Sequence, residues 1–209
     1  ELKRLRHLPA AMSAVLALAL SLGACAPMED AGTAPQAPVS DTDTAPNETP
    51  ADDSQASAGV MSRFTATDLE GVEVDQSIFS DYKLTMVNVW ATFCTPCINE
   101  MPDLGELAAE YSDQGVRIVG LVLDTLDSDG SISESQVETA KEIVDQTGAD
   151  YLHLLPSPDL YHILSDITGV PTTFFVDSTG AQVGHAIVTA QSKDAWIETI
   201  DSMLAEVEA

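Results

Sequence analysis

The stretch Trp90-Ala91-Thr92-Phe93-Cys94-Thr95-Pro96-Cys97 decides how this chain is interpreted. It follows residues 85–90, a short apolar run that favours a buried strand, and it leads into residues 96–111, where apolar residues recur with helical spacing. Two cysteines separated by two residues therefore stand where a buried strand meets the start of a helix.

The start of a helix is a favourable place for a reactive sulfur. Its first N–H groups have no partner within the helix, and the positive end of the helix dipole stabilises a thiolate there. Pro96 fits the first turn, where a missing N–H costs nothing. We therefore predict that Cys94 is the exposed nucleophile and Cys97 the resolving thiol, with exchange passing through a mixed disulfide on Cys94.

A zinc site and an inert structural disulfide are the alternatives for this cysteine pair. Zinc normally takes four ligands, and the chain has three cysteines in total. The third is Cys25, and His153, His162 and His185 show no ligand spacing. We expect no metal and no cofactor apart from the redox-active disulfide. An inert disulfide is disfavoured because so tight a pair is usually labile.

Apolar periodicity and turn signals predict one α/β domain over residues 60–209. The alternation of strands and helices favours a central mixed β-sheet flanked by helices, with a short N-terminal β extension. The predicted strands are residues 85–90, 116–123, 151–155, 172–176 and 182–189. The predicted helices are residues 96–111, 133–147, 159–168 and 192–207.

The first 25 residues are typical of a secretory signal. Basic residues precede an apolar run over residues 8–22, which is shorter than the roughly 20 apolar residues that span a bilayer. The run ends in Leu22-Gly23-Ala24-Cys25, which resembles the bacterial lipobox, where the cysteine is lipidated. We expect residues 1–25 to be a lipoprotein signal with lipid on Cys25. The alternative is a secreted protein or an uncleaved anchor in which Cys25 is incidental.

Composition predicts a linker and excludes one class of partner. Residues 26–59 are rich in Ala, Pro, Thr, Ser and Asp and hold no aromatic residue, so we predict a disordered acidic tether. The whole chain carries a formal net charge of -26 and only eight Lys and Arg. A protein with so large a negative charge repels the negatively charged phosphate backbone of nucleic acids, so nucleic-acid binding is not expected.

A second segment of the sequence supports the same interpretation as the cysteine pair. Residues 169–173, Gly-Val-Pro-Thr-Thr, place Pro171 at the start of an apolar strand, a position where a central strand tolerates proline. Together with Trp90, the C-x-x-C pair and the run Glu100-Met101-Pro102, this segment resembles the TlpA/ResA-like branch of the thioredoxin superfamily. The resemblance covers about residues 61–207. It implies a thioredoxin-like fold in which a cis bond before Pro171 faces the disulfide.

The resemblance also implies roles for further residues. Glu100 would lie near the sulfurs and tune their pKa, whereas the alternative is a solvated acid at a helix start. Two positions depart from the expected pattern, namely Asn88, where ordinary thioredoxin has an acid, and Phe93, where the branch usually has Trp. The residues expected to contact a client are Phe93, Thr95, Pro96, Val170 and Pro171.

The function implied is thiol–disulfide exchange outside the cytoplasm by an enzyme held to a bacterial membrane through Cys25. Its partners would be oxidised client proteins, such as apocytochromes c or other exported proteins, and an integral-membrane thiol donor. One alternative is a thioredoxin-fold lipoprotein that carries copper or haem, or holds a client, without turnover. Another is a thiol peroxidase, which needs a lone activated cysteine in a different motif. Thr95 and Pro96 do not fix the direction of electron flow.

Overall fold

The computed structural model describes residues 59–209, and its centre is a five-stranded mixed sheet with strand order β5-β4-β3-β6-β7. The strands are β3 (Leu84–Trp90), β4 (Val116–Val122), β5 (Leu152–Leu154), β6 (Thr172–Asp177) and β7 (Gln182–Ile187). The helices are α1 (Thr95–Tyr111), α2 (Glu134–Thr147), α3 (Tyr161–Asp166) and α4 (Lys193–Val207). The strands β1 (Thr65–Thr67) and β2 (Glu73–Asp75) form a separate antiparallel pair, which is the predicted N-terminal β extension.

The predicted strands and helices are confirmed, with ends that shift by one or two residues except at one helix. Residues 159–168 contain a short 3-10 helix, η4 (Pro158–Leu160), followed by α3, which ends at Asp166. Ile167 has an extended backbone and packs against the core instead of continuing the helix. Two further 3-10 helices, η2 (Gln76–Phe79) and η3 (Ser112–Gln114), were not predicted.

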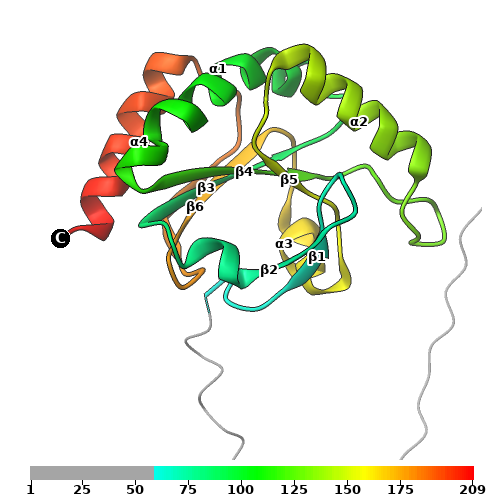
Figure 1. Ribbon diagram of the computed structural model, residues 1–209, viewed down its shortest axis with the longest axis horizontal. Helices are drawn as coiled ribbons and strands as arrows, with labels where there is room; N and C mark the ends of the chain where they lie inside the picture. The colour runs from blue at the N-terminus through cyan, green and yellow to red at the C-terminus, as the bar shows by residue number, and fades with distance from the viewer. Residues whose placement is uncertain (1–58) are drawn as a thin grey trace, which may run out of the picture. The chain divides into compact units, whose positions relative to one another are not determined.

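β3 is the central strand, and all seven of its residues are buried. It pairs in parallel with β4 and antiparallel with β6. Its side chains alternate between two cores, with Leu84 and Met86 packed beneath α1 and α4 and Val87 and Val89 on the opposite face. Figure 1 shows α1, α2 and α4 on one side of the sheet and β1, β2 and α3 on the other. Both faces are thus covered, which explains why every residue of β3 is buried.

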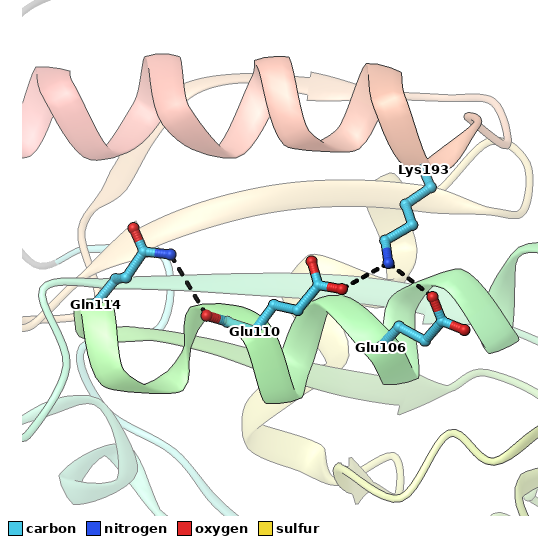
Figure 2. Close-up of polar contacts among 4 residues, drawn as sticks. All are labelled: Glu106, Glu110, Gln114 and Lys193. Atoms are coloured by element: carbon cyan, nitrogen blue, oxygen red, sulfur yellow. Dashed lines mark hydrogen bonds and ion pairs between the residues drawn. The ribbon is translucent and has the colours of Figure 1, made fainter.

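The helix α4 is fixed against α1 by charged side chains. Lys193 Nζ lies 2.7 Å from Glu106 Oε2 and 2.7 Å from Glu110 Oε1, so one cation near the start of α4 bridges two carboxylates of α1 (Figure 2). Hydrogen bonds to these two carboxylates raise the pKa of Lys193. Ser192 caps α4 by accepting a hydrogen bond from the Ala195 amide. The start of α4 therefore lies beside the second half of α1.

The predicted signal (residues 1–25) and the lipid on Cys25 lie outside the described residues. The predicted linker (residues 26–59) also lies outside them, apart from residue 59. Within residues 59–209, no helix has the length and apolar character needed to cross a membrane.

Candidate active site

The two cysteines of the C-x-x-C motif form a disulfide, and their Cα atoms are 5.3 Å apart. Cys94 is the N-cap of α1 and has an extended backbone, and its sulfur accepts a hydrogen bond from the Cys97 amide at 3.2 Å. The turn before it is closed by the Cys94 amide, which donates to the Ala91 carbonyl. The first sulfur therefore lies at the helix start, as the sequence predicts. Cys94 is 5% exposed and Cys97 is 0% exposed, so Cys94 is the more accessible of the two.

The residues predicted to contact a client lie in two segments. Phe93 is 72% exposed and is followed by exposed Thr95 and Pro96, which gives the disulfide an apolar neighbour on the surface. On the other segment, Val170 packs against the cluster of buried residues that includes both cysteines. The Val170–Pro171 peptide bond is cis, as predicted. Val89 pairs with Thr172, the residue after Pro171, and this pairing brings the cis-proline segment to the same end of the sheet as the cysteines.

Glu100 is buried, with 3% of its surface exposed, so the alternative of a solvated helix acid is wrong. Its Oε1 accepts a hydrogen bond from Asn88 Nδ2 at 3.0 Å. Its Oε2 accepts from the Gln191 amide at 3.1 Å and from Trp196 Nε1 at 3.3 Å. Burial raises the pKa of Glu100, the three donors oppose that shift, and the charge of Asp103 adds to it. Glu100 is thus a buried carboxyl group one helical turn beyond Cys97.

Asn88 occupies the middle of β3 and is completely buried. Its Nδ2 donates to Glu100 Oε1 and also to Thr173 Oγ1, at 3.0 Å in each case. Its Oδ1 has no hydrogen-bond partner among residues 59–209. The carboxamide in this buried strand was visible in the sequence as a departure from thioredoxin, but its pairing with Glu100 was not predicted.

A second buried hydrogen-bond chain lies behind the disulfide. Trp90 is fully buried, and its Nε1 donates to His153 Nδ1 at 3.1 Å, while His153 Nε2 lies 3.0 Å from the Ala149 carbonyl. Gly120 makes room for this ring, because a Cβ atom there would lie 2.0 Å from His153 Nδ1. Burial lowers the pKa of His153 to about 4, and the Ala149 carbonyl and Asp150 oppose that shift. His153 is therefore a satisfied neutral side chain and is not arranged as a metal ligand.

One further contact near the cysteines was not predicted. The Asp124 carboxylate accepts hydrogen bonds from the Thr92 amide at 3.0 Å and from the Thr92 hydroxyl at 2.6 Å. This pair ties the loop between β3 and α1 to the end of β4, which fixes the approach to Cys94. An acid placed directly after a buried strand was the available sequence signal for it. Residues 59–209 hold no group of three or more His, Cys, Asp or Glu side chains arranged to bind a metal ion.

Comparison with known proteins assigns the fold and the site to a family. The family model described as "AhpC/TSA family" matches residues 59–181, which is more than half of the chain. The chain belongs to the AhpC/TSA family. The part matched includes the C-x-x-C motif, Glu100 and the cis-proline segment.

Two curated relatives that are similar to this chain have the same name. The thiol-disulfide oxidoreductase ResA of Bacillus thuringiensis (strain Al Hakam) is 29% identical over 131 residues, which cover 63% of this chain and 69% of the relative. ResA of Oceanobacillus iheyensis is 37% identical over 120 residues, which cover 52% of this chain and 53% of the relative.

Solved structures agree on the fold. A thioredoxin-family thiol:disulfide interchange protein from Chlorobium tepidum TLS has a TM-score of 0.55 and 25% identity, covering 68% of this chain and 93% of that one. A secreted Mycobacterium tuberculosis disulfide oxidoreductase has a TM-score of 0.51 and 20% identity, covering 70% of this chain and 97% of that one. This AhpC/TSA-family chain is therefore a ResA-like oxidoreductase of thioredoxin fold, and its chemistry is thiol–disulfide exchange.

Proposed function

We propose that the protein reduces disulfides in exported client proteins, with electrons from an integral-membrane thiol donor. The clients we propose are oxidised C-x-x-C pairs, of the kind found in apocytochromes c, and other extracytoplasmic disulfides. The observation that supports this best is the disulfide at the start of α1, with an exposed Phe93 next to Cys94 in the sequence and a buried Glu100 one helical turn after Cys97.

The reaction proceeds in two exchanges. The Cys94 thiolate of the reduced protein attacks one sulfur of the client disulfide, which forms a mixed disulfide and releases one client thiolate. Cys97 then attacks the Cys94 sulfur, which closes the Cys94–Cys97 disulfide and releases the second client thiolate. Two electrons pass to the client, and the membrane donor restores the two thiols.

Client binding follows from the two segments around the sulfurs. An extended client segment pairs with the backbone at Val170 as an added strand, next to the cis bond before Pro171. Phe93, Thr95 and Pro96 provide the exposed surface on the other side of Cys94. Because Phe93 is the most exposed large apolar side chain among the described residues, it is the strongest candidate for a direct contact.

Glu100 serves as the proton carrier of the site. Burial disfavours its charged form, so it takes up and releases a proton more readily near neutral pH than an exposed carboxyl group does. It accepts the proton of Cys97 as that thiol attacks, and it returns the proton to the sulfur that leaves in the reverse direction. The spacing of three residues on α1 places both side chains on one face of the helix.

The location we propose is the outer side of a bacterial membrane, with lipid on Cys25 as the anchor and residues 26–59 as the tether. The support is the basic, apolar and small-residue order of the first 25 residues. Labelling cells with a radioactive or clickable fatty acid tests the anchor directly. The label should appear on the parent protein and be absent from a Cys25→Ala variant.

Thiol counting tests the exchange function. The purified protein should gain two reactive thiols with dithiothreitol and lose both when mixed with an oxidised C-x-x-C peptide, while the peptide gains two. A Cys94→Ser/Cys97→Ser variant is the control and should do neither. Copper or haem that co-purifies in stoichiometric amount, with no thiol transfer to the peptide, would favour a carrier instead. Consumption of hydroperoxide by the reduced protein at a comparable rate would favour a peroxidase.

A further inference from the structure

The buried carboxyl group of Glu100 can hold a proton at only one of its two oxygens. Oε2 faces the Gln191 backbone amide and Trp196 Nε1, and both groups can only donate a hydrogen bond. A proton on Oε2 would point at two donors. Oε1 faces a single partner among the described residues, the Asn88 side chain, so the proton must reside on Oε1.

Asn88 is suited to both protonation states of Glu100. With the carboxylate, Nδ2 donates to Glu100 Oε1 and to Thr173 Oγ1. With the carboxylic acid, this NH₂ group would face an O–H donor. Rotation of the amide by half a turn exchanges Nδ2 with Oδ1, which then accepts from the acid. The rotation breaks no bond at Asn88 Oδ1, which has no partner among the described residues, but it moves Nδ2 away from its two acceptors to a place where it has none.

Thr173 completes the exchange because a hydroxyl group both donates and accepts. Its oxygen now accepts from Asn88 Nδ2 at 3.0 Å. After rotation of the amide, the same hydroxyl turns its hydrogen toward Asn88 Oδ1. All three side chains are buried and lie on three different elements, β3, α1 and β6, so Glu100 and Thr173 keep their places while the two atoms of the Asn88 amide exchange theirs and the direction of each hydrogen bond is reversed.

We infer that Asn88 is a positioning residue that reverses its amide each time Glu100 gains or loses a proton, with Thr173 as its partner. Asn88 thus pairs with Oε1 of Glu100 in both forms, and it favours the charged form because the rotated NH₂ group has no acceptor among the described residues. This inference rests on the proposed role of Glu100 as proton carrier, which it deepens. It also explains why an amide stands in the middle of β3, since Asp there would place two carboxyl groups in contact and Leu could pair with neither form.

The groups facing Glu100 limit what else can titrate with it. While Cys94 and Cys97 are joined in the disulfide, Asp103 on α1 and Tyr151, just before β5, are the ionisable side chains among the described residues whose charge acts on Glu100 or responds to it. β3, β6 and α4 present neutral groups to the Asn88–Glu100 pair. The pKa of Tyr151 is raised by burial and by the charge of Glu100, so Tyr151 stays neutral over the range in which Glu100 titrates.

Nuclear magnetic resonance of the purified, isotopically labelled chain tests the inference. The side-chain NH₂ resonances of Asn88 should shift with pH, with the same midpoint as the carboxyl carbon of Glu100. In a Glu100→Gln variant they should be independent of pH and should match the low-pH form of the parent, since the Gln amide also donates toward Asn88. Asn99, which is exposed and adjacent to Glu100 in the sequence, is the control and should not follow the titration. Asn88 resonances that stay constant while Glu100 titrates would overturn the inference.

Kinetics provides the second measurement. Asn88→Leu, of similar size, should slow exchange with an oxidised peptide by about tenfold, the cost of leaving one buried polar partner unpaired. The same change in a Glu100→Gln background should cost no further rate, because residue 100 then exchanges no proton that Asn88 could support. Independent, multiplicative losses would contradict the inference. If Glu100→Gln leaves thiol exchange unchanged while the Asn88 resonances still titrate, the proton-carrier role fails and the amide reversal stands.

Discussion

The pKa of the single residue Glu100 depends on two opposing effects, its burial and its hydrogen bonds. Burial alone would keep the carboxyl group neutral, whereas donors from Asn88, Gln191 and Trp196 favour its charge. These opposing effects give a group that can exist in either form. The sequence indicated the acid near the cysteines through its resemblance to a family. It did not indicate the donors, because Gln191 contributes a backbone amide and Trp196 comes from the far end of the chain.

Glu100→Gln should lower the apparent pKa of the active-site thiols by about one unit, because a nearby carboxylate disfavours a thiolate. Exchange with protein clients should become slower, since the proton carrier that we propose is lost. Thiol alkylation rates measured against pH, for the parent and the variant, check both effects. Superimposable curves would leave Glu100 without a role in the thiol chemistry.

The same variant should differ from the parent in the pH dependence of stability. The pKa of Glu100 is raised on folding, so its contribution to the free energy of unfolding is present below the unfolded pKa and is lost as pH rises through the folded value. Glu100→Gln lacks this loss, so its stability relative to the parent should increase over that range. Chemical denaturation at a series of pH values gives the comparison, and a difference that is constant with pH would contradict it.

At the scale of the elements, buried hydrogen bonds tie together strands and helices that the sequence places far apart. The His153 ring connects β5 to Trp90 at the end of β3 and to Ala149 after α2. The strands and helices themselves could be predicted from apolar periodicity and from caps such as Ser192 and Gly148. The room that Gly120 leaves for the His153 ring could not be predicted, because it depends on the pairing of β4 with β5, which places Gly120 opposite His153.

His153→Gln should make the protein less sensitive to mild acid. The pKa of His153 falls to about 4 on folding, so its stabilising contribution is present above the unfolded value and is lost as pH falls through the folded value. The contribution lost is on the order of 3 kcal/mol, the free energy equivalent of that shift. Gln can accept from Trp90 and donate to the Ala149 carbonyl but carries no charge. Denaturant unfolding of both proteins between mildly acidic and neutral pH measures their free energies of unfolding. These should approach each other as pH falls, whereas a difference that is constant with pH would exclude this role.

At the scale of the whole molecule, the chain combines a conventional fold with a strongly acidic composition. The formal net charge is -26, and three described lysines, Lys83, Lys141 and Lys193, already lie within 4.0 Å of carboxylates. The acidity was visible in the composition, but it carries no information about the fold. The fold depends instead on the buried positions of β3, α1 and β6, which the sequence pattern does indicate.

Salt should stabilise the folded protein at neutral pH. Screening weakens repulsion among surface carboxylates that lie about 10 Å apart or more. The melting temperature should therefore rise steadily between about 0.05 M and about 0.5 M NaCl. The rise should be smaller at about pH 4, where many carboxylates are neutral. A melting temperature that falls with salt would mean that the ion pairs outweigh the repulsion.

The central claim is that Cys94 attacks the client and Cys97 resolves the mixed disulfide. Incubating reduced Cys97→Ser and reduced Cys94→Ser variants with an oxidised C-x-x-C peptide, followed by mass spectrometry of the adducts, tests it most directly. Cys97→Ser should accumulate a stable adduct on Cys94, because the resolving sulfur is gone, while Cys94→Ser should accumulate little because its remaining cysteine is fully buried. A stable adduct on Cys97 in the Cys94→Ser variant, with none on Cys94 in the other, would contradict the account.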